Sequence, residues 1–113
     1  MLDVEYVENH KENIFRRTNK RLELVSKLIA FINTYGPSYD RFYYSLILNL
    51  NNIAEHYLVS GNDRIILSLY LVYSQSKANN KSEREIYNDL RNELYHLPVY
   101  TINEVEQRRL RHK

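Results

Sequence analysis

The chain has 113 residues, enough for one domain, and its 43% of hydrophobic residues suffices for a packed core. Cysteine is absent, which excludes a disulfide framework, a thiolate metal site and a cysteine nucleophile. Two glycines and two prolines are far fewer than the tight turns of a sheet-rich fold require, so the composition predicts a few long helices. A formal net charge of +2 says little by itself about a nucleic-acid partner.

The N-terminal segment Met1–Lys11 has no basic start followed by an apolar run, so it does not resemble a secretory signal. The longest apolar stretch, Ile65–Tyr73, is too short to cross a bilayer. We therefore expect a cytoplasmic protein without membrane association. A single helical domain is expected over residues 1–113, with frayed ends at 1–8 and 110–113.

The first helix is predicted to begin at Val4 or Asn9 and to reach Thr34, because apolar residues recur there at helical spacing between charged and amide side chains. Gly36 and Pro37 are predicted to end it. The glycine would supply a left-handed C-cap, and the proline cannot continue the hydrogen-bond ladder.

Ser38 or Asp40 is expected to cap a second helix, which would end at Gly61. The predicted buried stripe of this helix consists of Phe42, Leu46, Leu50, Ile53 and Tyr57. It is widened by Tyr43, Ile47, Ala54 and Leu58, which predicts burial on more than one side.

A third element is predicted to start at Asn62 or Asp63, and its apolar residues fit a strand as well as a helix. We expect a helix, because the sequence offers no partner strand and an isolated strand cannot satisfy its backbone.

Ser82 and Glu85 form a capping box that opens a fourth helix, and its predicted apolar face consists of Ile86, Tyr87, Leu90 and Leu94. This helix should end near His96, because Pro98 forces the preceding residue out of the helical region. Thr101 is expected to begin a short fifth helix. The predicted fold is all-α: a four-helix up-and-down bundle with a short C-terminal fifth helix.

The segment with chemical specificity lies near the end of the fourth helix. Arg91 offers a fixed positive fork for a phosphate, and His96 can move protons at neutral pH. Together with Asn92, which could position the ligand or the histidine, they would suffice for metal-free RNA cleavage. Five residues turn an ideal helix through about 500°, so the Arg91 and His96 side chains point about 140° apart. Convergence therefore requires a distorted helix end or a second subunit.

Leu90–His96 resembles the R-x4-6-H signature of HEPN domains, in the form R-N-x-L-x-H. The similar surroundings, Ile86–Asp89 and Tyr100–Asn103, extend the resemblance over about residues 50–105. It implies a helical bundle that dimerises along the motif helix, with Arg91, His96 and Asn92 as its catalytic or RNA-binding residues. Many such domains are ribonucleases of toxin–antitoxin or defence systems, and others are binding modules. The expected partners are thus a second copy, RNA and a protein such as an antitoxin.

Two basic clusters are candidate phosphate-binding sites: Arg16, Arg17, Lys20 and Arg21 in the first helix, and Arg108, Arg109 and Arg111 near the C-terminus. Each is also compatible with a solvated helix face or tail. Likewise, the Arg91 guanidinium could serve in a salt bridge, and His96 could simply be favoured by the helix dipole. No cofactor is expected, and the spacing of the four histidines predicts no metal site.

Other classes of protein fit the same residues. One is a non-enzymatic helical regulator from a virus, plasmid or other mobile element, binding nucleic acid or a protein. Another is a protein-binding bundle similar in length and helicity to bacteriocin-immunity proteins. Tyrosine supplies eleven of the fourteen aromatic residues, which fits either a homodimer interface or core edges that reach solvent.

Overall fold

The computed structural model describes residues 4–96, and these residues form four α-helices and no strand. The helices are α1 (Val4–Tyr39), α2 (Tyr43–Ser60), α3 (Arg64–Ala78) and α4 (Glu83–Tyr95). The predicted all-α fold is confirmed, including the helical form of the third element. The predicted fifth helix lies outside the described residues.

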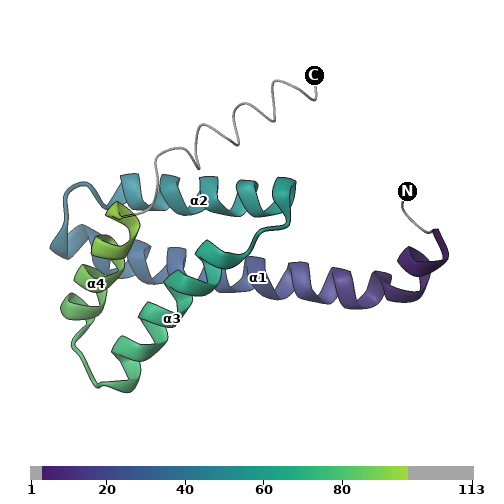
Figure 1. Ribbon diagram of the computed structural model, residues 1–113. Helices are drawn as coiled ribbons and strands as arrows, with labels where there is room; N and C mark the ends of the chain where they lie inside the picture. Colours follow the sequence, from purple (N-terminus) through teal and green to yellow (C-terminus); the bar gives the residue numbers. More distant parts are fainter. Residues whose placement is uncertain (1–3, 97–113) are drawn as a thin grey trace.

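The helices pair as two hairpins (Figure 1). α1 and α2 run side by side in opposite directions, and the hairpin of α3 and α4 lies obliquely across them. The N-terminal part of α1 projects beyond the other three helices. Within the described part of the chain, no helix is both long and apolar enough to span a membrane.

A single core lies where the two hairpins cross, and all four helices contribute to it. Its buried apolar residues are Val25, Leu28, Phe31, Ile32, Leu46, Leu50, Ile53, Tyr57, Ile66, Leu69, Ile86, Tyr87, Leu90 and Leu94. The predicted apolar face of α4 is confirmed at all four positions. On α2 the prediction was too wide, because Phe42 and Leu58 are 56% and 58% exposed. This helix packs on one side and presents its other side to solvent.

The predicted end of the first helix at Gly36 and Pro37 is wrong, since α1 continues through both residues to Tyr39. Pro37 lies two residues before the end of α1, so its missing N–H removes one hydrogen bond from the last turn of the helix only. The Asp40 N–H still donates to the Gly36 carbonyl, at 2.8 Å. Gly36 serves a different purpose, because a Cβ atom there would lie 2.6 Å from the Cβ of Tyr43. The glycine lets α2 pass close to α1 at the corner that joins them.

The remaining helix ends follow local chemistry. Gly61 ends α2 in a left-handed conformation, φ +72°, as predicted. The Ser82 hydroxyl accepts the Glu85 N–H at 3.2 Å, which confirms the predicted cap of α4. The predicted cap of the second helix by Ser38 or Asp40 is wrong, because Ser38 lies inside α1 and Phe42 occupies the N-cap position of α2 without a side-chain cap. The Asp40 carboxylate instead accepts the N–H of Phe42 itself, at 2.9 Å. At the start of α3, Asp63 occupies the N-cap position without capping, and its carboxylate binds elsewhere.

Candidate nucleic-acid interface

Arg91 points from α4 toward the corner between α1 and α2. Its guanidinium lies 4.0 Å from the Asp40 carboxylate, and the Tyr87 hydroxyl donates to the same carboxylate oxygen at 3.2 Å. Burial and the negative charge of Asp40 raise the pKa of Tyr87, so this phenol remains a proton donor at neutral pH. Arg91 is 32% exposed, and the Asp40 side chain only 8%. Its contacts are those of a structural ion pair.

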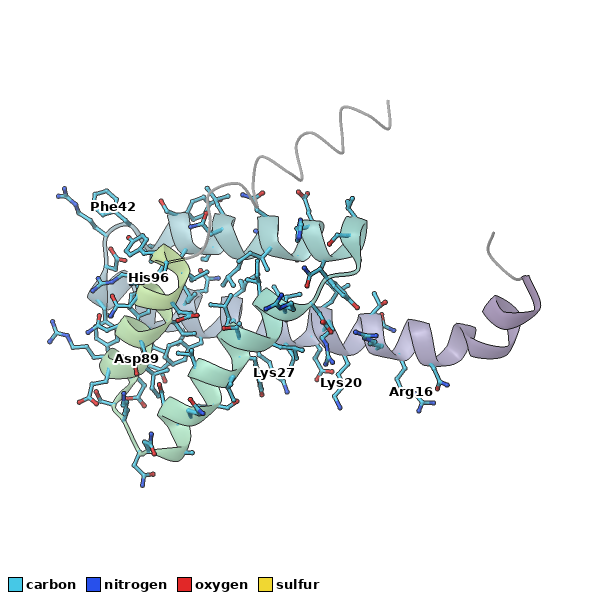
Figure 2. The ribbon with its side chains drawn as sticks, in the orientation of Figure 1. Arg16, Lys20, Lys27, Phe42, Asp89 and His96 are labelled. Carbon is cyan, nitrogen blue, oxygen red and sulfur yellow. The ribbon has the colours of Figure 1, made fainter. Side chains whose placement is uncertain are left out.

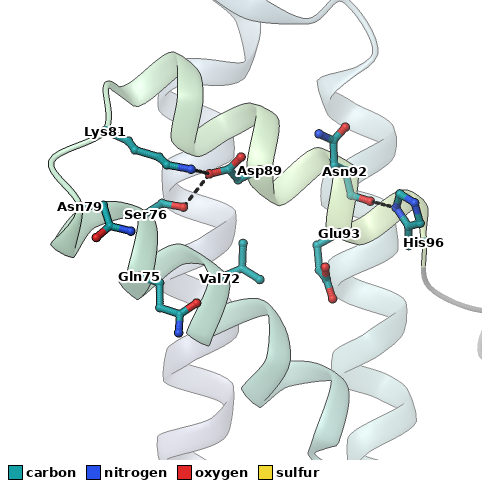
Figure 3. Close-up of a pocket in the computed structure, with 9 residues that line it drawn as sticks. All are labelled: Val72, Gln75, Ser76, Asn79, Lys81, Asp89, Asn92, Glu93 and His96. Carbon is teal, nitrogen blue, oxygen red and sulfur yellow. Dashed lines mark hydrogen bonds and ion pairs between the residues drawn. The ribbon is translucent and has the colours of Figure 1, made fainter.

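His96 and Asn92 are exposed on another side of α4 (Figure 3). The His96 ring donates from Nδ1 to the backbone carbonyl of Asn92, one turn earlier. Both residues line a pocket of about 430 Å³ between α3 and α4. Arg91 and His96 therefore have separate partners, and the described part of this chain does not bring them together.

The pocket beside His96 contains two carboxylates. Asp89 accepts a hydrogen bond from Ser76 and one from Lys81, each at 2.8 Å, and the Lys81 contact lowers the pKa of Asp89 below its usual value. Glu93 accepts a hydrogen bond from Ser68. The Lys81 charge is thus already neutralised, and the pocket is a poor place for an RNA phosphate. Among residues 4–96, no group of three or more acidic or histidine side chains could hold a metal ion.

The basic cluster of the first helix divides into two pairs with different surroundings. Arg17 and Arg21 both bind one Asp63 oxygen, at 3.2 Å and 2.8 Å, and so tie α1 to the start of α3. The hydrogen bond from Arg21 lowers the pKa of Asp63. Arg16 and Lys20 are exposed, and they project with Lys27 from one side of α1 (Figure 2). The predicted cluster Arg108, Arg109 and Arg111 lies outside the described residues.

We call Arg16, Lys20 and Lys27 the basic face of α1. Their spacings of four and seven residues place all three within about 40° of one another around an ideal helix, along about 16 Å of its axis. Lys27 is 3.7 Å from Glu23, but both side chains are exposed, and exposed pairs at this spacing are weak. The three cations are therefore able to turn toward phosphates.

An open groove of about 850 Å³ lies between α1, α3 and the start of α4. We name it the tyrosine–lysine groove after six of its lining residues: Tyr35, Tyr70, Tyr73, Lys27, Lys77 and Lys81. No sequence pattern predicted this groove. The spacing of Tyr70, Tyr73 and Lys77 at i, i+3 and i+7 places them on one helix face, but it does not reveal that this face meets Lys27 of α1.

The aromatic rings of the groove are held by one another and by the core. Tyr73 packs edge-to-face on Phe31 with ring centroids 5.3 Å apart, and Tyr70 lies 5.9 Å from Tyr73. The Lys77 ammonium is 4.8 Å from the centre of the Tyr73 ring, and its hydrogen bond to Tyr73 raises the pKa of Lys77. The groove therefore combines fixed aromatic surfaces with the Lys77 ammonium, which is held in its charged form.

Comparison of the chain with protein-family models, curated proteins and solved structures gave no match. The resemblance to HEPN domains accordingly rests on the residues from Leu90 to His96 and their surroundings. Functional inference rests on the geometry of the basic face and the groove.

Proposed function

We propose that this protein is a helical RNA-binding domain of the HEPN-like kind, and that it contacts RNA through the basic face of α1. One observation carries the proposal: Arg16, Lys20 and Lys27 are exposed on one side of the helix, whereas Arg17 and Arg21 are bound to Asp63. A row of exposed cations along a rigid helix attracts a phosphate backbone and releases its counterions. Phosphate contacts of this kind position nucleic acid without reading its sequence.

Competing acidic groups near this face are few among the described residues. Glu23 lies between Lys20 and Lys27, and its exposed pair with Lys27 gives way easily to a phosphate, since such pairs contribute about 0.3–0.5 kcal/mol. Asp89 and Glu93 instead line the pocket between α3 and α4. Three cations and one carboxylate thus share this side of α1, and the local excess of positive charge supports phosphate binding there.

The proposal is tested by reversing charge on the basic face in Arg16→Glu/Lys20→Glu. Binding of a labelled single-stranded RNA, followed by fluorescence anisotropy at 50–100 mM salt, should weaken at least tenfold, because two phosphate contacts become repulsive. The matched control, Arg41→Glu/Arg64→Glu, changes the net charge equally at two exposed positions that do not belong to the basic face. It should alter the affinity less than threefold.

The salt dependence of the RNA affinity measures the number of the same phosphate contacts independently. Each phosphate contact with single-stranded nucleic acid contributes a slope of about −0.7 in log affinity against log salt, so three contacts predict a slope near −2. Equal weakening by the control would show general charge attraction rather than a binding face. Absence of RNA binding would refute the proposed function, and tighter binding of duplex DNA would favour the regulator from a mobile element.

RNA cleavage by Arg91 and His96 stays a prediction, and so does a role in a toxin–antitoxin or defence system. Because Arg91 pairs with Asp40 and His96 lines a separate pocket, cleavage requires a second copy that supplies the missing partner. His96→Ala is the informative variant, since the exposed ring can be removed without creating a cavity. RNA cleavage in the presence of a chelator that survives in His96→Ala would exclude His96 from catalysis.

A further inference from the structure

The tyrosine–lysine groove begins where the basic face of α1 ends, and Lys27 belongs to both. We propose that this groove binds single-stranded RNA, with bases stacked on Tyr70 and Tyr73 and phosphates at Lys27 and Lys77. The inference rests on the proposed RNA-binding function and specifies the form of RNA that is bound. Its basis is the combination of ring surfaces and cations in one groove, which is how proteins hold single strands without reading sequence.

The rings form a prearranged stacking surface. Tyr70 and Tyr73 are half-buried and pack against the core, and the edge-to-face contact with Phe31 fixes the Tyr73 ring. A base that stacks here does not have to order a mobile side chain first, which lowers the entropic cost of binding. Tyr35 lines the same groove, and its ring is nearly parallel to that of Tyr39, with 5° between their planes.

The lysines are placed to receive the backbone of a stacked strand. The Lys77 ammonium lies over the face of the Tyr73 ring, and Lys77 itself is exposed. A base can replace the exposed ammonium there, and the ammonium can move to the adjoining phosphate. Glu83 also lines the groove, opposite in charge to the lysines. It lies in the first turn of α4, where a carboxylate is favoured by the helix dipole.

Duplex RNA does not fit this arrangement. In an A-form duplex the bases stack on one another, so their faces are unavailable to tyrosine rings, and the protein meets backbone and groove edges. The groove volume of about 850 Å³ lies in the range of pockets for small ligands, about 300–1,000 Å³. It therefore accommodates unpaired bases rather than a double helix.

The test compares Tyr70→Leu with Tyr70→Phe in the full chain, using a labelled 12-nucleotide oligoadenylate and the same strand paired with oligouridylate. Wild-type protein should bind the single strand more tightly than the duplex. Tyr70→Leu keeps an apolar side chain but removes the stacking ring, and should weaken single-strand binding about tenfold. Tyr70→Phe retains the ring and should stay within about twofold of wild type.

Two further measurements exclude a general loss of structure. Tyr44→Leu, on the exposed side of α2, should bind RNA as wild type does. Circular dichroism should show equal helix content in all variants. Because the chain contains no tryptophan, tyrosine emission can be followed directly, and oligoadenylate should quench less of it in Tyr70→Leu than in Tyr70→Phe.

The outcomes separate this inference from the proposed function. If Arg16→Glu/Lys20→Glu weakens RNA binding but Tyr70→Leu does not, RNA binds at α1 without the groove and the inference is wrong. Tighter binding of the duplex would also overturn it. If wild-type protein binds neither RNA, the proposed function fails and the inference fails with it.

Discussion

At the scale of single residues, Asp63 joins two distant parts of the chain through one carboxylate oxygen. It is buried beside the start of α3, and it receives Arg17 and Arg21 from α1. Arg21 makes the shorter contact and is the less exposed, at 20% against 62% for Arg17. A buried carboxylate requires such partners, because burial without them penalises its charged form.

We therefore predict that Asp63→Asn lowers the free energy of unfolding by about 1.5–3 kcal/mol at pH 7, the range for a hydrogen bond to a charged group. Because the folded pKa of Asp63 is lowered, the unfolded chain binds more protons in acid, and the stabilisation is lost as pH falls through the folded pKa. Urea denaturation at pH 7 and at a series of pH values below 3.8 should show a difference between variant and wild type that is largest at pH 7 and shrinks as the pH falls.

Matched arginine variants give the control for this prediction. Arg21→Ala should destabilise the protein more than Arg17→Ala, because exposed ion pairs contribute little. An equal effect of the two would contradict the role assigned to burial.

The basic cluster shows what a sequence can and cannot tell at this scale. Arg16, Arg17, Lys20 and Arg21 were predicted together as phosphate contacts, since all are cations within two turns. Arg17 and Arg21 are bound to Asp63, which lies 46 and 42 residues away from them in the chain. Only the packing of α1 against the start of α3 distinguishes the occupied pair from the exposed one. The same applies to Arg91, whose partner Asp40 is 51 residues away in the chain.

At the scale of helices, the corner between α1 and α2 depends on Gly36. Glycine inside a helix costs about 0.5–1 kcal/mol relative to alanine, so its presence in α1 needs a compensating reason. The reason is the close approach of Tyr43, whose Cβ would be 2.6 Å from a Cβ at position 36. Both atoms are attached directly to helical backbone, so a change of rotamer cannot relieve the contact.

Gly36→Ala should therefore destabilise the fold by about 1–3 kcal/mol, the cost of overpacking, in spite of its better helix propensity. Thermal or urea unfolding measures the change. In a double-mutant cycle with Tyr43→Gly, the two losses should be less than additive, because the second change removes the opposing Cβ. A stabilised Gly36→Ala would show that the helices separate here at no cost.

Helix boundaries and faces were predictable where the signal is local. The left-handed Gly61, the Ser82–Glu85 cap and the apolar stripe of α4 each depend on residues within a few turns of one another. The prediction failed at Gly36, because a glycine that ends a helix and one that admits a neighbouring helix look the same in sequence. The exposure of Phe42 and Leu58 was missed for a related reason. Periodicity marks an apolar face but not the width that its neighbours cover.

At the scale of the whole molecule, the small net charge of +2 does not show how unevenly the charged side chains are distributed over the surface. Arg16, Lys20 and Lys27 lie on one side of α1, and Asp89 and Glu93 line the pocket between α3 and α4. With three cations and one carboxylate, Glu23, this side of α1 carries a local excess of positive charge without a large total charge. Composition cannot show it, because it depends on which helix faces are covered by neighbours.

The tyrosine–lysine groove exists only at this scale, because its walls come from α1, α3 and α4. The eleven tyrosines of the sequence fitted an interface or core edges that reach solvent, but they did not indicate where such a surface lies. The crossing of the two hairpins determines which rings share a groove with lysines. The predicted homodimer stays a prediction and would add a second such groove to the assembly.

The contact between Gly36 and Tyr43 has an evolutionary consequence. Because the obstacle at position 43 is the Cβ atom itself, every residue there except glycine presents the same obstacle. Position 43 can therefore drift among aromatic and aliphatic residues while position 36 stays glycine. A diverged chain that keeps this corner should show an invariant glycine opposite a variable neighbour, and replacement of that glycine should coincide with a wider separation of the first two helices.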